Sequence, residues 1–369
     1  ADKAALDISD LKAEGVSLGL DAVVEGLAAS PQGSLSLDPL ALDLGALASL
    51  FALDAPLQGV VAGAVRVQGN TEHLELEGRM ELGEGSVEWS AQVDAWQQIP
   101  DWEIALELSA VDPSSYFAEL EPSRLTGQVR AKGRGWVPGP STELEISLKP
   151  GLCFGVELDA LDLAAHVQED GVELSRLRVD SPLGQIDAAG AFVAEKFRGN
   201  VSANVSNLAR LGEFGLADLG GSASAVGRLE WGVGDSSVRF EGQMSGRRVK
   251  VADGVVMQEA EGPLQFSWQE NVLRASGRTE ARGMELNESR LGEASIEWSG
   301  DFRDSGFDVE GVLKAGGLEA AGVRVGALAG RFRAGANSPL EMDLDIRLRE
   351  ASWQGLRADD GLLRLELSE

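Results

Sequence analysis

The chain has 369 residues, and 60 Asp and Glu against 32 Lys and Arg give it a net charge of -28. Such a charge repels phosphate backbones and anionic surfaces, which argues against nucleic-acid binding. Hydrophobic residues make up 43% of the chain, so its acidity does not indicate disorder. The single cysteine, Cys153, excludes an internal disulfide and a thiolate metal cluster, and no run approaches the roughly 18 apolar residues of a membrane span.

The first 38 residues already alternate between apolar and polar side chains, which predicts β-strands. The period then changes, because Leu44, Leu47, Leu50 and Phe51 recur at helical spacing within 40–53. We therefore expect a short helix there, ending before Pro56, which cannot continue it.

This junction of a cap, a short helix and a new small-residue strand recurs twice. The second copy runs from Asp112 through an expected helix at 116–120, and the third runs from Asn207 through an expected helix at 211–214. Each is followed by Leu-x-Gly or Leu-Gly-Gly, at Gly127 and Gly221. The junctions predict repeat units at 1–56, 57–124, 125–218 and 219–369, within one elongated body rather than separate domains.

Between the junctions, short alternating runs follow one another, for example 144–148, 154–158, 172–174 and 177–180. The turns between them are too short for a crossover helix, so neighbouring strands should pair antiparallel. We predict an all-β fold in which a long antiparallel meander, with three short helices at the repeat junctions, curls into a U-shaped groove. An open sheet of about 25 strands must split, close or curl.

One face of this meander is acidic and the other apolar. The apolar face could be the packed core of a β-sandwich, but the three short helices are too small to cover it. We therefore expect a trough that takes an apolar occupant. Its expected lining is Leu74, Leu76, Trp89, Ile104, Leu106, Ile146, Phe154, Val156, Leu158, Leu174, Val179, Ile186, Trp231, Phe240, Phe266, Trp268, Trp298, Val309, Leu344 and Ile346.

The sequence offers no catalytic constellation. The carboxylate pairs Glu75/Glu77 and Glu103/Glu107 occur in alternating strands, so they are expected on the solvated face rather than converging in a pocket. The two histidines, His73 and His166, lack metal-ligand spacing. We expect no enzyme activity, no metal and no cofactor.

A resemblance to a known family is carried mainly by residues 151–192. There, the runs Leu161–Val167, Asp170–Leu174, Leu177–Val179 and Ser181–Gly190 resemble the repeated segments of the TamB/AsmA-like bacterial envelope proteins. The Leu-x-Gly junctions at Gly59, Gly127 and Gly221 are similar to the recurring units of that family.

The resemblance implies a β-taco trough, located in the periplasm, in a full-length protein anchored in the inner membrane. It also implies phospholipids as partners, moved between the inner and outer membranes, and an outer-membrane barrel partner through regions absent here. On this hypothesis the chain, which ends in the rhythm of a strand, is a fragment of a longer protein. The alternative function is a scaffold that assists assembly of outer-membrane β-barrel proteins by pairing with their strands.

Overall fold

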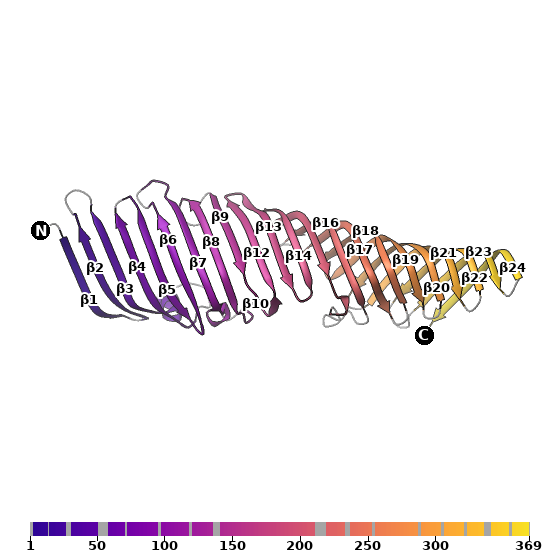
Figure 1. The fold of residues 1–369 in the computed structure, drawn as a ribbon, viewed down its shortest axis with the longest axis horizontal. Coiled ribbons are helices and arrows are strands. Elements are labelled where there is room, and N and C mark those ends of the chain that lie inside the picture. The colour runs from indigo at the N-terminus through magenta and orange to yellow at the C-terminus, as the bar shows by residue number, and fades with distance from the viewer. Residues whose placement is uncertain are drawn as a thin grey trace. The chain divides into compact units, whose positions relative to one another are not determined.

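A computed structural model describes residues 3–13, 15–26, 31–50, 58–70, 72–94, 97–117, 120–135, 141–210, 219–232, 237–252, 255–286, 289–303, 306–320, 323–335, 341–353 and 356–368. Over these ranges the chain is all-β. Twenty-two strands form one long antiparallel sheet, and two more form a separate hairpin (Figure 1). It divides into two compact units, Ala1–Pro182 and Leu183–Glu369. The four expected repeat units stay a prediction.

Unit 1 is a meander interrupted by short helical turns and by one small hairpin. Its elements are β1 (Lys3–Ala13), β2 (Val16–Glu25), β3 (Gln32–Asp43), α1 (Leu44–Leu50), β4 (Val60–Asn70), β5 (Leu74–Leu82), β6 (Gly85–Val93), β7 (Asp101–Val111), η1 (Pro113–Ser115), β8 (Leu125–Arg134), β9 (Ser141–Leu148), β10 (Gly151–Cys153), β11 (Val156–Leu158), β12 (Ala160–Gln168) and β13 (Gly171–Ser181). Strand β9 pairs with β12, because β10 and β11 pair with each other in a separate hairpin, which a single bridge between Leu152 and Arg124 connects to the start of β8.

Unit 2 is an uninterrupted meander with longer strands. Its strands are β14 (Gly184–Val193), β15 (Lys196–Val205), β16 (Gly220–Gly232), β17 (Val238–Ala252), β18 (Val255–Gln269), β19 (Val272–Leu286), β20 (Ser289–Arg303), β21 (Gly306–Ala320), β22 (Val323–Gly335), β23 (Glu341–Trp353) and β24 (Leu356–Ser368). Each pairs antiparallel with the next one in the chain, as expected for turns this short.

The helices and one strand differ in part from the expectation. Helix α1 lies within the first predicted helix. At the second junction the described residues form the 3₁₀ turn η1, and Tyr116, where a helix was expected, is outside it and buried; residues 118 and 119 of the expected helix lie outside the described ones. The predicted strand at 154–158 is instead a turn and one arm of a hairpin, because Phe154 and Gly155 both adopt positive φ. The third expected helix, at 211–214, lies outside the described residues.

The junction after β7 is held by one carboxylate. Oδ1 of Asp112 accepts hydrogen bonds from the Ser114 backbone N–H at 3.0 Å, from the Ser114 hydroxyl at 2.8 Å and from the Ser123 backbone N–H at 2.9 Å. Burial alone would raise the pKa of Asp112, but these hydrogen bonds outweigh it and lower the pKa below its usual value. The carboxylate therefore joins the turn η1 to the start of the next β run.

We expect Asp112→Ala to destabilise unit 1 by about 1 kcal/mol, the usual effect of losing such a cap, and Asp112→Asn to cost less. Because the folded-state pKa is lowered, the stabilising effect of the charge is complete above the unfolded pKa of about 3.9 and is lost as the pH falls through the folded value. Urea unfolding at pH 7 and pH 3 checks this. If the free energy of unfolding differs between wild type and Asp112→Asn by the same amount at both pH values, the charge of Asp112 does not stabilise unit 1.

A line of unusual backbone geometry, here called the crease, crosses β17 to β23. Positive φ occurs in every second strand, at Arg248, Gly283, Gly317 and Glu350. The strand registers place these residues side by side with Gln258, Gly292 and Gly326 in the intervening strands. A positive φ takes these residues out of the regular extended backbone of a strand. Parts of these strands run behind their front portions in Figure 1, as bent strands do.

The buried core of unit 2 flanks the crease. Its members are Ala281, Met284, Leu291, Ala294, Ala315 and Leu328. In a regular strand, side chains on one face are two residues apart, yet Ala281 and Met284 are both buried, as are Leu291 and Ala294. The crease therefore shifts the alternation by one residue, so that apolar side chains point inward on both sides of the bend.

Candidate functional site: a continuous apolar face

One row of side chains crosses every sheet strand of unit 1. Direct cross-strand pairs connect its members in sequence, and all of them are apolar or glycine. This unit 1 row consists of Ile8, Leu20, Leu37, Val65, Gly78, Trp89, Leu106, Val129, Ile146, Leu163 and Leu177. With about 4.8 Å between neighbouring strands, its ten steps span about 48 Å.

Unit 2 carries a second such row near the turns that join its strands. Direct pairs connect Phe192, Phe197, Trp231, Val238, Trp268, Leu273, Phe302 and Phe307, the unit 2 row. Two residues further along β17 and β18, Phe240 and Phe266 stack with ring centroids 5.2 Å apart. The apolar face is thus continuous across the eleven sheet strands of unit 1 and across β14 to β21 in unit 2.

Large rings on this face lie over glycines. A Cβ on Gly78 would come within 2.6 Å of the Trp89 indole, and a Cβ on Gly242 within 2.7 Å of the Phe240 ring. The same relation holds for Trp102 over Gly133, Phe197 over Gly199, Trp298 over Gly277 and Phe332 over Gly311. Rings cover neighbouring glycines in this way in many sheets. These rings therefore pack flat against the sheet instead of projecting from it.

Most side chains of these rows are half-buried rather than enclosed. Ile146, Leu106 and Leu163 are half-buried, whereas Trp231 is 47% exposed. The described residues contain no second sheet large enough to cover the face, since the only other one is the hairpin β10–β11. The face is therefore partly open to a ligand.

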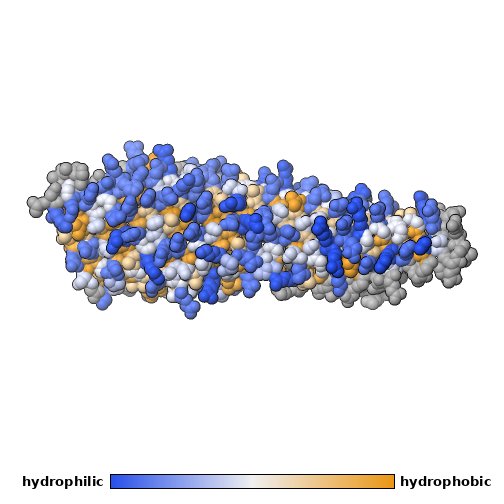
Figure 2. Space-filling view, in the orientation of Figure 1, coloured by the Kyte–Doolittle hydropathy of each residue, from blue (hydrophilic) through white to orange (hydrophobic). Residues whose placement is uncertain are grey.

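The opposite face is polar and ion-paired. Nζ of Lys132 lies 2.8 Å from Oε2 of Glu143, and this hydrogen bond lowers the pKa of Glu143 and raises that of Lys132. Arg66 pairs with Glu77, and Arg79 pairs with Glu88, across neighbouring strands. Figure 2 shows hydrophilic side chains spread over the viewed surface, with hydrophobic ones between them. Because these pairs are exposed, they contribute mainly to solubility.

The predicted lining residues fall into three groups. The registers place fifteen of them on the apolar face of the two sheets: Leu74, Leu76, Trp89, Ile104, Leu106, Ile146, Leu174, Val179, Ile186, Trp231, Phe240, Phe266, Trp268, Trp298 and Val309. Phe154, Val156 and Leu158 lie at the hairpin β10–β11 instead, outside the sheet. Leu344 and Ile346 are opposite Phe332 and Gly330 in the register, but their side chains lie outside the described ones.

Sequence reasoning missed Phe197 and Phe302 in the lining, as well as the glycines beneath the rings. A signal was present, since Phe197-x-Gly199, Phe240-x-Gly242 and Gly300-x-Phe302 each put a ring and a glycine on one face of a strand. The pairs across strands, such as Trp89 over Gly78, depend on register and leave no such local trace.

The polar residues form no converging catalytic or metal site where the structure is described. Glu75, Glu77, Glu103 and Glu107 are exposed. Nδ1 of His73 lies 2.8 Å from Oδ1 of Asp94, close to the turn between β4 and β5. No group of three or more His, Cys, Asp or Glu side chains that could hold a metal occurs among the described residues.

Comparisons with known proteins add no relative: no family model, no curated protein and no solved structure matches the chain. None of the helices in the described residues is long and apolar enough to cross a membrane. What the structure defines is a class, an all-β protein with a long, half-buried apolar face.

Proposed function

We propose that this protein is a non-enzymatic conduit that shields phospholipid acyl chains while they pass through an aqueous compartment. The observation that carries the proposal is the unbroken apolar row across all eleven sheet strands of unit 1, with a second row across β14 to β21 of unit 2. The resemblance to TamB/AsmA-like envelope proteins supports the periplasm as the compartment, with lipid moving between the inner and outer membranes.

The geometry of the face suits a sliding chain better than a fixed ligand. Each CH₂ group removed from water contributes about 0.8 kcal/mol. The rows repeat the same kind of contact at every strand, and the rings lie over glycines instead of projecting as barriers. An acyl chain would therefore meet similar surroundings along the row.

The proposal includes a trough, the β-taco, formed by curling of each sheet. The crease supports this shape in unit 2, because residues with positive φ interrupt the extended backbone at the same level in every second strand from β17 to β23. In this arrangement acyl chains lie inside the bend and polar headgroups remain in water. A membrane anchor and an outer-membrane barrel partner belong to the proposal through regions of a longer protein.

Native mass spectrometry of the purified protein, followed by lipid extraction from the same sample, tests the conduit. We expect several phospholipids per chain, because a continuous face offers several equivalent places. A lipid-free protein that also takes up no added phosphatidylethanolamine would overturn the proposal. Crosslinking of edge strands to unfolded barrel proteins, without lipid, would favour the assembly scaffold instead.

A further inference from the structure

Cationic side chains gather at one edge of unit 2, around a hollow in the surface of the sheet. This hollow has a volume of about 910 Å³ and lies where β16, β18, β20 and β22 end and where β17, β19 and β21 begin. Its lining includes Lys196, Arg198, Arg239, Arg274, Arg303 and Arg333, but only five acidic residues. The whole chain has 32 basic and 60 acidic residues, so cations are strongly enriched here.

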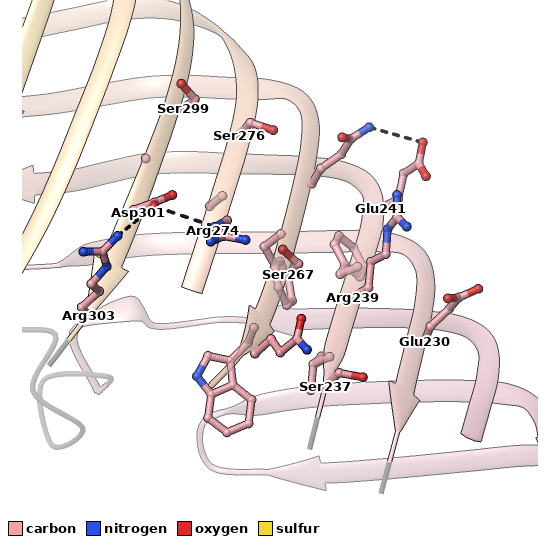
Figure 3. A pocket seen from close by; sticks show the side chains of 18 of the residues that line it. Glu230, Ser237, Arg239, Glu241, Ser267, Arg274, Ser276, Ser299, Asp301 and Arg303 are labelled. Carbon is pink, nitrogen blue, oxygen red and sulfur yellow. Dashed lines mark hydrogen bonds and ion pairs between the residues drawn. The ribbon is translucent and has the colours of Figure 1, made fainter. Parts of the chain in front are cut away.

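Two of these cations share one carboxylate, and two others have none nearby in the described part of the chain. Arg274 and Arg303 both contact Asp301, at 3.8 and 3.4 Å (Figure 3). Arg198 lies 3.5 Å from Glu230. Among the residues that the structure describes, no carboxylate lies within 4.0 Å of the Arg239 guanidinium or the Lys196 ammonium group. These two groups can therefore bind an anion without first losing an ion pair.

Two exposed tryptophans lie beside this cluster on the apolar face. Trp231 is 47% exposed and Trp268 is 38% exposed. Val238 separates them in the unit 2 row, which puts their strands about 10 Å apart. Lys196 pairs with Gly232, the residue after Trp231. An indole ring has an apolar body and a polar N–H, which suits the boundary between acyl chains and headgroups.

The cations and the rings alternate along the same strands. Arg239 precedes Phe240, and Arg274 follows Leu273. Adjacent side chains in a strand point to opposite faces, so the two cations project from the polar face and their apolar neighbours from the other. Only at the turn edge do the two faces come together, and long Arg and Lys side chains can reach around it. The hollow is bordered by both sets, which is the arrangement that an amphipathic ligand needs.

We propose that this edge binds the phosphate-bearing headgroup of an anionic glycerophospholipid, while its acyl chains lie on the unit 2 row. The inference rests on the proposed conduit and adds a headgroup preference to it. Guanidinium groups recognise phosphate through paired, charge-assisted hydrogen bonds. The net charge of -28 repels a nucleic acid, whereas a single lipid headgroup meets only the local cations.

The test uses phosphatidylglycerol and phosphatidylcholine with brominated acyl chains, which quench tryptophan fluorescence on contact. The variant Lys196→Gln/Arg239→Gln removes the two cations without a carboxylate partner. The control Arg66→Gln/Arg79→Gln removes the same charge from the exposed polar face of unit 1. Trp231→Phe/Trp268→Phe shows whether the quenching comes from these rings, and circular dichroism checks that each variant folds.

We expect the wild type and the Arg66/Arg79 control to bind phosphatidylglycerol equally well. The Lys196/Arg239 variant should bind it at least about tenfold more weakly, because the loss of even one of its two charge-assisted contacts implies that factor, with phosphatidylcholine little affected. The quenching should fall in Trp231→Phe/Trp268→Phe, whereas the part that comes from Trp89 in the unit 1 row should remain.

Equal binding of both lipids, unchanged in the Lys196/Arg239 variant, would overturn the headgroup site and leave the conduit standing. Failure of both lipids to bind would overturn both proposals. Displacement of phosphatidylglycerol by millimolar inorganic phosphate would identify a site for the free anion and would also overturn the lipid assignment.

Discussion

Leu106→Glu is expected to reduce the number of phospholipids bound to the protein at least severalfold, whereas Ala105→Glu should leave it unchanged. Leu106 lies in the middle of the unit 1 row, paired with Trp89 and Val129. A carboxylate at this position would have to lose its water whenever an acyl chain covered it, which costs several kcal/mol. Because the row is continuous, one charge in its middle should also stop lipid from passing along it.

The neighbouring position is a matched control. Ala105 pairs with Ser90 and Arg130 and therefore faces the polar side of the same strand. Native mass spectrometry counts the lipids bound to each variant, and transfer of a fluorescent phospholipid between vesicles measures movement. Leu106→Gln, which adds polarity without charge, should give an intermediate result in both assays.

Folding of these variants separates an open face from a closed core. If the half-buried row is a lipid-binding surface, Leu106→Glu should unfold in urea at a concentration close to that of the wild type. If unit 1 instead encloses a dry sandwich core, the variant should unfold or aggregate, because a buried unpaired charge is strongly destabilising. The latter outcome would contradict the conduit.

Phe240→Ala is expected to destabilise unit 2 by about 3–5 kcal/mol, the usual cost of removing a buried aromatic ring. Phe240 is only 5% exposed, lies over Gly227 and Gly242, and stacks on Phe266. Without the ring, two adjacent glycines lose their cover and Phe266 loses a neighbour. Neither glycine has a side chain that could fill the space.

Urea unfolding monitored by circular dichroism measures this loss. Val193→Ala is the control, because Val193 is 52% exposed and its removal should change the free energy of unfolding by less than about 0.5 kcal/mol. A loss below about 1 kcal/mol for Phe240→Ala would show that the ring is not packed against the sheet. In that case Phe240 would be available to ligands, like Trp231.

Local sequence determined which face of each strand is apolar. In 144–148, for example, Leu144, Ile146 and Leu148 must lie on one side, because side chains in an extended strand alternate. The short turns also determined that neighbouring strands pair antiparallel, since no crossover can be built from them. The all-β class and most of the predicted lining follow from these two facts.

Only the tertiary structure decided where the alternation is interrupted and which side chains meet across strands. The crease aligns Gly283, Gly292 and Gly317 from three different strands, and no single strand shows that alignment. The cover of Gly78 by Trp89 and the side-by-side placement of Trp231, Val238 and Trp268 likewise depend on register. Register is a property of pairs of strands, so periodicity within one strand cannot reveal it.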